Sequence, residues 1–386
     1  MQSFTFHTPT EVIFGKNEEE KAGSLTKKYG GTKVFVVYGG GSAVKSGLLA
    51  KIVSKFEGIE HMLFGGAQPN PLLSHAKEGV KQAIEFGADA ILAVGGGSVI
   101  DTAKAIAHGV KNPDTDIWKF WKREVELKQS LPVGVVLTIS AAGSETSDSA
   151  VLTNAETGEK RGLKTDFNRP RFTIMNPELT YTVPRYHVAA GIADIMMHTM
   201  DRYFAQQEGE NDFTDAIAEG LLRTVIKNAP ILLAEPTNYH AASEIMWCGS
   251  VSHNGITGLG RPFDFSVHQL GHELSGKYDV SHGASLATMW GSWAEYVQGV
   301  NQAPVRFAKY AKNVWGVSGT GIHETVNFFK SIGMPTCFTE LGIGVQSDAV
   351  INEMASSCVF HGARKVGNFL PLEKGDVAKI YRKANR

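Results

Sequence analysis

Over roughly the first 180 residues, short apolar runs alternate with stretches of helical spacing. Lys33–Tyr38, Ala88–Val94 and Pro132–Thr138 are rich in apolar and β-branched residues, which predicts buried strands. The first two end in glycine-rich turns, and helical spacing follows, as in Val99–His108. The order strand, glycine turn, helix is typical of a parallel α/β sheet.

From about Pro184 onward the pattern changes to long segments of helical period with few strand-like runs. These segments are Ala216–Asn228, Ala241–Gly249, Ser266–Leu274 and Leu286–Tyr296. We therefore predict two domains, an α/β domain over residues 1–184 and an all-helical domain over residues 185–386. We expect the functional site in the cleft between them.

Two glycine clusters follow predicted strands and open predicted helices. They are Gly39-Gly40-Gly41-Ser42 and Gly95-Gly96-Gly97-Ser98. Glycine there lets a phosphate approach the backbone, and a helix N-terminus offers free N–H groups and partial positive charge. Each cluster can equally be a tight strand-to-helix turn. The second cluster continues to Asp101 and Lys104, which places both in the first helical turns beside the expected phosphate position.

Tyr29 and Lys33 have the Tyr-x-x-x-Lys spacing that short-chain dehydrogenases use. Such a pair acts together only on one face of a helix. Gly30 and Gly31 lie between them and indicate a turn, so we expect no catalytic role for this pair.

The composition excludes several classes of protein. The 386 residues carry 38 Lys and Arg against 39 Asp and Glu, a net charge of −1, which disfavours binding to nucleic acid or to a membrane surface. Hydrophobic residues make up 42%, enough for a substantial core. Three dispersed cysteines form no CxxC pair, and we see neither a signal peptide nor an apolar run of about 18 residues. We expect a reducing, cytoplasmic location.

A group of histidines and one aspartate has the spacing of a metal site. Asp194 and His198 lie four residues apart in a helical stretch, as do His268 and His272, and His282 follows ten residues later. Three imidazoles and one carboxylate suit a divalent transition metal, Fe²⁺ or Zn²⁺, with a coordination position left open. A single histidine of this kind is more often a hydrogen-bonded core or surface residue. Seventy residues separate the two segments, so spacing alone leaves open whether they meet.

These features occur together with two further motifs. The full set is Gly95-Gly96-Gly97-Ser98-x-x-Asp101-x-x-Lys104, Ala193-Asp194-x-x-x-His198, His268-x-x-x-His272 followed by Ser281-His282-Gly283, Pro69-Asn70-Pro71, and Asn176-Pro177-Glu178-Leu179-Thr180. The combination resembles the iron-containing (type III) alcohol dehydrogenases, and within them the NADPH-dependent butanol dehydrogenase and aldehyde reductase branch. The resemblance spans nearly the whole chain. Ser140–Glu145 departs from the commoner Thr-Ser-Gly-Thr-Gly-Ser-Glu form.

The resemblance implies a role for individual residues. The metal ligands would be Asp194, His198, His268 and His282. His272 would lie near the nicotinamide without binding metal. We expect a catalytic role for it, in which it relays the proton to the alkoxide. The alternative is that His272 only packs beside the nicotinamide and shapes the pocket. The residues expected to bind the cofactor are Gly95, Gly96, Gly97, Ser98, Asn70, Asp101, Thr138 and Lys160, in addition to the first glycine cluster.

The first glycine cluster also predicts the cofactor. Sites specific for NAD often end this strand with an acidic residue that binds the ribose hydroxyls and would repel a 2′-phosphate. Here Val34–Tyr38 ends instead in Gly39, Gly40, Gly41 and Ser42. We therefore predict that the cofactor is NADP(H). The alternative is that the glycines form only a turn and the enzyme uses NADP(H) and NAD(H) equally well.

The expected activity is hydride transfer between NADP(H) and a small alcohol or aldehyde, such as butanol or butyraldehyde, assisted by the metal as a Lewis acid. The alternatives with the same fold are a glycerol- or propanediol-type polyol dehydrogenase that uses NAD and a dehydroquinate-synthase-like lyase. A metal-dependent hydrolase is an alternative of another class. The resemblance implies a homodimer, with no nucleic-acid or membrane partner.

Overall fold

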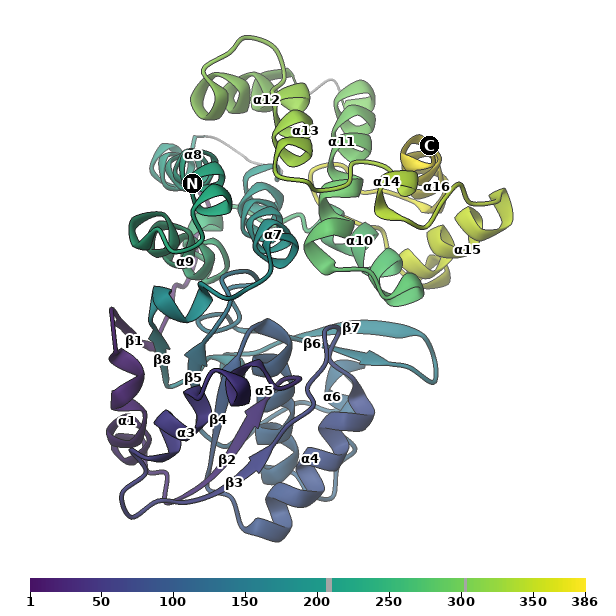
Figure 1. Ribbon diagram of the computed structural model, residues 1–386. Helices are drawn as coiled ribbons and strands as arrows, with labels where there is room; N and C mark the ends of the chain where they lie inside the picture. The colour runs from purple at the N-terminus through teal and green to yellow at the C-terminus, as the bar shows by residue number, and fades with distance from the viewer. Residues whose placement is uncertain (206–209, 302–303) are drawn as a thin grey trace. The chain divides into compact units, whose positions relative to one another are not determined.

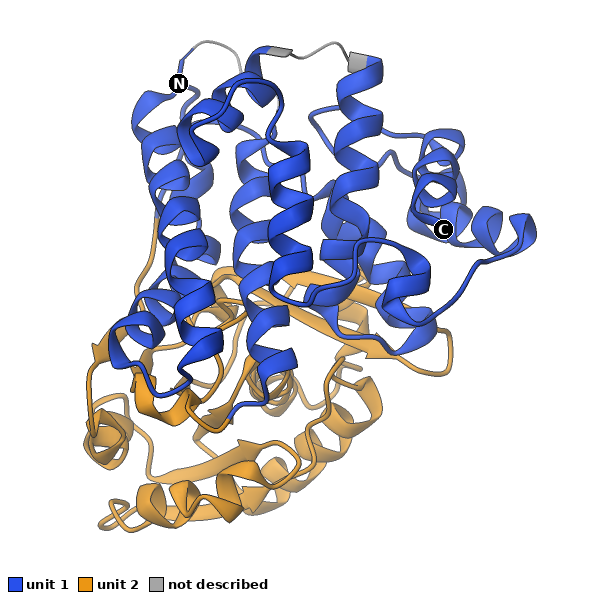
Figure 2. Ribbon diagram, turned by 45° about the horizontal axis from the view of Figure 1, so that its top comes forward, with its two compact units in different colours: residues 1–6, 183–386 blue, residues 7–182 orange. Residues whose placement is uncertain are grey.

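The computed structural model describes residues 1–205, 210–301 and 304–386. These residues fall into two units, one of residues 7–182 and one of residues 1–6 together with 183–386 (Figure 2). The first six residues belong to the second unit, where the backbone N–H of Gln2 donates to the carbonyl of Gly260 at 2.9 Å. These six residues are therefore outside the α/β unit, whereas the sequence pattern predicts an α/β domain that begins at residue 1.

A parallel sheet of six strands forms the centre of the unit of residues 7–182, which confirms the predicted fold class (Figure 1). The strand order is β1-β8-β5-β4-β2-β3. The strands are β1 (Glu11–Phe14), β2 (Lys33–Tyr38), β3 (Glu60–Phe64), β4 (Ala90–Gly95), β5 (Val133–Leu137) and β8 (Phe172–Met175). Every residue of β4 and β5 is buried, as expected for central strands covered on both faces.

Successive side chains of the sheet pack against different helices. Val34 and Val36 contact the core beneath α1 and α3, whereas the ring of Phe35 contacts Phe64, which in turn stacks on His75 of α4. The helices of this unit are α1 (Ala22–Lys28), α2 (Ser42–Lys45), α3 (Leu48–Val53), α4 (Leu73–Phe86), α5 (Gly97–Lys111) and α6 (Trp118–Trp121). The alternation along β2 therefore supports a helical layer on each face.

An antiparallel hairpin that we did not predict follows β5. It consists of β6 (Ser149–Asn154) and β7 (Glu159–Lys164). The sequence of β7, Glu-Lys-Arg-Gly-Leu-Lys, carries one buried apolar residue, Leu163, so it lacks the apolar run that revealed the central strands. Its pairing with β6, rather than its own pattern, determines its conformation.

The second unit is helical, as predicted. Its helices are α7 (Arg185–Tyr203), α8 (Asp212–Ala234), α9 (Tyr239–His253), α10 (Ser266–Tyr278), α11 (His282–Asn301), α12 (Pro304–Tyr310), α13 (Ile322–Ser331), α14 (Phe338–Leu341), α15 (Asp348–Cys358) and α16 (Lys374–Ala384). Helix α7 is buried at every position from Ala189 to Tyr203 and packs against α8, α9, α10 and α11. None of the described helices combines the length and apolar character that a lipid bilayer requires.

Candidate functional site

The central helix α7 contributes two of the predicted metal ligands. Asp194 and His198 lie one turn apart, and each is 4% exposed. The Oδ1 atom of Asp194 lies 3.3 Å from Nδ1 of His198. The four-residue spacing thus brings a carboxylate and an imidazole together inside the helical unit.

Two further histidines face the same carboxylate oxygen from other helices. The Nε2 atoms of His268 on α10 and His282 at the start of α11 lie 3.7 and 3.8 Å from Oδ1 of Asp194. Asp194, His268 and His282 offer ligand atoms that all lie within 4.8 Å of one another. His198 is outside that group of three, although its ring centroid is 4.4 Å from that of His268.

The atoms that face one another at this site are the ones a cation would require. Within the described ranges, Oδ1 of Asp194, Nδ1 of His198 and Nε2 of His268 are buried and have no hydrogen-bond partner. Unpartnered buried polar atoms are costly, and a metal ion removes that cost by binding all of them. One carboxylate oxygen and imidazole nitrogens form a donor set that fits Fe²⁺ or Zn²⁺.

The electrostatics of the imidazoles are consistent with such a site. Burial, with smaller contributions from neighbouring imidazoles, holds the pKa of His198 well below its usual value, so this ring is neutral as a metal ligand must be. For His268, burial lowers the pKa, but the carboxylates of Asp194 and Asp201 outweigh it and raise the pKa overall. The carboxylates of Asp194 and Asp201 therefore favour positive charge on or beside the ring of His268.

His272 lies on α10 one turn beyond His268, next to these residues but outside the group of three. Its ring centroid is 5.2 Å from that of His282 and 6.4 Å from that of His268. This position keeps its ring beside the expected metal position without adding it to the cluster of ligand atoms.

Two neighbours of the cluster were not identified from the sequence. His253, at the end of α9, packs edge-on against the ring of His198 with a centroid distance of 3.9 Å. Asp201 on α7 accepts a hydrogen bond of 2.6 Å from Nδ1 of His268. The signal for Asp201 was its position seven residues after Asp194, on the same helix face. No spacing in the sequence points to His253.

The two glycine clusters lie at the same edge of the parallel sheet. Strands β2 and β4 are neighbours; the first cluster follows Tyr38 at the end of β2, and the second begins at Gly95, the last residue of β4. Ligands of open α/β sheets bind at this edge. Thr138 lies there as well, because its N–H donates to the carbonyl of Gly95 at 3.1 Å.

The packing explains the glycines of the second cluster better than those of the first. A Cβ atom at Gly96 would lie 2.0 Å from the side chain of Ile139, and one at Gly95 would lie 2.5 Å from that of Val99. These glycines are therefore needed by the chain's own packing, whatever they bind. At Gly40 a Cβ would meet no atom within 4 Å and the backbone has no positive φ, so neither contact nor conformation requires glycine there.

Asp101 and Lys104 hold the segment after β5 against helix α5. The carboxylate of Asp101 accepts hydrogen bonds from Oγ of Ser144 at 2.5 Å and from the N–H of Val151 at 2.9 Å. Nζ of Lys104 donates to Ser144 and to the carbonyl of Ser149 at 2.7–2.8 Å. Burial raises the pKa of Asp101 and lowers that of Lys104 to about 8. Both carboxylate oxygens of Asp101 thus accept hydrogen bonds from within the α/β domain.

Asn70 and Lys160, two other residues expected to bind the cofactor, contact each other. Nζ of Lys160 on β7 donates to Oδ1 of Asn70 at 2.8 Å. The loop and the hairpin are also joined by the N–H of Thr153, which donates to the carbonyl of Pro71 at 2.8 Å. Asn70 has a left-handed backbone, with φ of 55°. Such strained conformations are found preferentially at functional sites.

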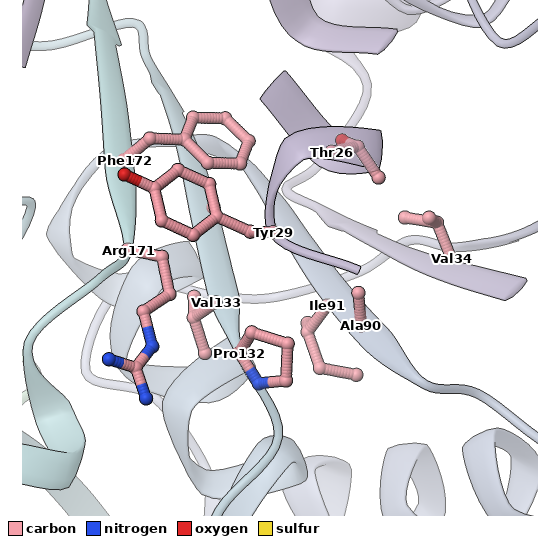
Figure 3. Close-up of a pocket in the computed structure, with 10 residues that line it drawn as sticks. Thr26, Tyr29, Val34, Ala90, Ile91, Pro132, Val133, Arg171 and Phe172 are labelled. Carbon is pink, nitrogen blue, oxygen red and sulfur yellow. The ribbon is translucent and has the colours of Figure 1, made fainter. Parts of the chain in front are cut away.

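A pocket lies at the amino ends of the strands, away from the glycine clusters at their carboxyl ends, and contains none of the predicted site residues (Figure 3). Its lining residues precede or begin strands β2, β4, β5 and β8 and include Tyr29, Pro132 and Arg171. Tyr29 donates to Glu11 at 2.9 Å, and Lys33 begins β2 and pairs with Glu60. Tyr29 and Lys33 are therefore not on one helix, as we expected from the glycines between them.

Comparisons with known proteins match the whole chain. The family model of iron-containing alcohol dehydrogenase matches residues 9–177, and that of the Fe-containing alcohol dehydrogenase family, C-terminal, matches residues 188–385. The NADH-dependent butanol dehydrogenase A of Clostridium acetobutylicum is 38% identical over 100% of both chains. The NADPH-dependent aldehyde reductase YqhD of Escherichia coli is 32% identical over 100% of both chains. The solved structure of an NADH-dependent butanol dehydrogenase A from Thermotoga maritima has a TM-score of 0.94, 33% identity and coverage of 100% of this chain and 99% of that one.

Proposed function

The chain belongs to the iron-containing alcohol dehydrogenase family, and we propose that it interconverts a small alcohol and its aldehyde, such as butanol and butyraldehyde, by hydride transfer with NADP(H). The observation that carries this proposal is that three buried atoms, Oδ1 of Asp194, Nδ1 of His198 and Nε2 of His268, face one another without a hydrogen-bond partner among the described residues. A dehydrogenase that polarises a carbonyl with a metal requires this kind of donor set.

We assign the metal to Asp194, His198, His268 and His282. When bound, a divalent cation supplies Lewis-acid chemistry at the substrate oxygen and the nicotinamide supplies the hydride. The chain's own residues hold the cation through neutral imidazoles and one carboxylate. His272, beside His282 and outside the ligand group, is in place to hold and pass a proton through its ring nitrogens.

We assign the dinucleotide to the glycine turns after β2 and β4. Helix α5 is 15 residues long and begins at Gly97, so its free N–H groups can bind a pyrophosphate. The preference for NADP(H) rests on the end of β2, where Gly39-Gly40-Gly41-Ser42 offers N–H groups and a hydroxyl and no carboxylate. Butanol dehydrogenases similar to this chain are named for NADH and the aldehyde reductase for NADPH, so the cofactor needs a direct test.

Metal analysis tests the ligand assignment. We expect one metal per chain in the purified protein and little in His268→Ala. His323→Ala removes an exposed histidine of α13 and should retain full metal content. Full metal content in His268→Ala would refute the assignment. Spectroscopy or elemental analysis of the same samples distinguishes iron from zinc.

Steady-state kinetics test the reaction. A panel of short aldehydes, alcohols and diols, each assayed with NADPH and with NADH, should give the highest kcat/KM for a monofunctional substrate with NADPH. Equal kcat/KM values for the two cofactors would contradict the preference. If the highest kcat/KM is instead that for a diol with NAD, the result would favour a polyol dehydrogenase. A reaction without net oxidation or reduction of the nicotinamide would favour a lyase.

We propose further that the enzyme is a homodimer in the cytoplasm. Three buried cysteines, Cys248, Cys337 and Cys358, are free thiols, which suits a reducing compartment. The proposal of a homodimer rests on the resemblance to the family. Light scattering of the purified protein tests it, and a single-chain mass would contradict it.

A further inference from the structure

We infer that Asp201 is a positioning residue of the metal centre, whose buried carboxylate holds the imidazole of His268 with Nε2 directed at the metal. This inference rests on the proposed function, because it assigns a task toward the same ion. It concerns a residue outside the ligand set and a contact that the sequence motifs do not contain.

Two hydrogen bonds join Asp201 to His268. The Oδ2 atom of Asp201 accepts from Nδ1 of the His268 ring at 2.6 Å and from the His268 backbone N–H at 3.2 Å. A carboxylate only accepts hydrogen bonds, so the ring proton of the neutral imidazole must be on Nδ1. The lone pair is then on Nε2, the atom that lies 3.7 Å from Oδ1 of Asp194 and has no hydrogen-bond partner within the part of the chain that is described.

The sequence of α7 places this carboxylate with the ligands. Asp194, His198 and Asp201 are spaced by four and three residues, which puts all three on one face of the helix. One helix thus provides two ligands directly and, through Asp201, orients a third that comes from α10. Histidine ligands of metals commonly donate their second N–H to a carboxylate, which fixes the ring and increases its basicity.

The burial of Asp201 argues against a purely structural role. The residue is 0% exposed, and its Oδ1 atom has no hydrogen-bond partner among the described residues. A buried, half-satisfied carboxylate costs stability. Asparagine would accept the same bond from His268 without that charge, so packing alone gives no reason for an aspartate here. A cation bound by His268 does give one.

The test compares metal affinity with stability. Asp201→Asn keeps the shape of the side chain and a neutral acceptor for Nδ1–H, but it removes the charge that strengthens this hydrogen bond and increases the basicity of Nε2. After metal is stripped with a chelator, titration with Zn²⁺ against a chromophoric chelator should show binding weaker by about 10- to 100-fold than in the wild type. The melting temperature of the metal-free variant should be equal to or above that of the metal-free wild type. A purely structural role predicts the reverse, a lower melting temperature with unchanged affinity, and that result would overturn the inference.

Thr199→Val is the matched control. Thr199 is also 0% exposed on α7 and bonds to the carbonyl of Ile195 within its own helix, so its loss should leave Zn²⁺ affinity unchanged. The wild type separates the two claims: if it binds no Zn²⁺, the proposed function fails. If it binds and D201N binds equally tightly, the function stands and only the role of Asp201 is wrong.

A second measurement does not depend on the folding of D201N. In metal-free wild type with ¹⁵N-labelled histidine, at mildly alkaline pH, the His268 ring should be the Nδ1–H tautomer. Its signals can be assigned as those missing from His268→Gln. A ring protonated on Nε2 would overturn the inference.

Discussion

The start of α11 packs directly on the backbone of α7, because a Cβ atom at Gly283 would lie only 1.9 Å from the carbonyl oxygen of Ala190. Gly283 follows His282, and Ala190 precedes Asp194 by one helical turn. The close approach of Gly283 to Ala190 therefore holds His282 near Asp194, with 3.8 Å between Nε2 of the histidine and Oδ1 of the aspartate. Glycine is the only residue that allows it, since the obstacle is backbone and cannot rotate away.

Gly283→Ala should disturb both the fold and the metal site. We expect a loss of about 1–3 kcal/mol in the free energy of unfolding, as for other overpacked sites, together with reduced metal content. Gly299→Ala, on the same helix but with open space around its Cβ, should instead be neutral or stabilise by up to about 1 kcal/mol. Denaturant unfolding and elemental analysis of the two variants give the comparison. Normal metal content and stability in Gly283→Ala would contradict the packing argument.

Gly40→Asp should shift the cofactor preference toward NADH. The Cβ position at Gly40 is open, so the carboxylate fits without strain and can bind ribose hydroxyls while it repels a 2′-phosphate. We expect the ratio of kcat/KM for NADPH to that for NADH to fall by about tenfold or more, since one like-charge contact of about 1.4 kcal/mol is sufficient. Gly40→Ala adds the Cβ without charge and should keep the wild-type ratio. A ratio that falls equally in both variants would point to a steric cause.

His272→Gln should lose activity and keep its metal. Its ring lies outside the group of ligand atoms, so metal content and dinucleotide binding should not change. If His272 relays the proton, the rate should fall by roughly ten- to a thousandfold and its pH dependence should flatten. Rate and pH profiles of the metal-loaded variant, with elemental analysis, measure this. Loss of metal would make His272 a ligand, and an unchanged rate would leave it a packing role.

His108→Gln should reduce the acid sensitivity of the fold. Burial lowers the pKa of this ring from 6.5 to about 4, and it is held between Oγ of Ser130 and Oδ1 of Asn168 at 2.8 Å each. Between these two pH values the unfolded chain binds a proton that the folded chain does not, so stability falls as the pH falls from 6.5 to about 4. This contribution is roughly 3 kcal/mol in all.

The measurement for His108→Gln is the free energy of unfolding at several pH values. The variant will be less stable at neutral pH, because it loses buried hydrogen bonds, but its stability should fall less steeply over this range. His61→Gln, which removes an exposed ring of the same domain, should retain the wild-type slope. A wild-type slope in His108→Gln would show that other groups cause the acid sensitivity.

Local patterns of apolar residues were sufficient to predict the central strands and the helical character of the second half of the chain. The apolar run of Lys33–Tyr38 coincides with β2, and the ends of the runs Ala88–Val94 and Pro132–Thr138 lie within two residues of the ends of β4 and β5. These strands are covered on both faces, so burial selects apolar residues at every position. Strand β7 shows the opposite case, since its polar sequence becomes a strand only through its pairing with β6.

The residues that could form a metal centre and two phosphate-binding turns are recognisable from the sequence, because helical spacing and strand-to-helix turns are local properties of the chain. That residues 194, 268 and 282 meet, and that Asp201 and His253 join them, follows from the tertiary fold, because contacts between distant segments depend on how α7, α9, α10 and α11 pack. The fold likewise shows that neighbouring side chains require glycine at positions 95 and 96 but not at Gly40. The space around a residue is a property of the packed fold, and spacing along the chain does not contain it.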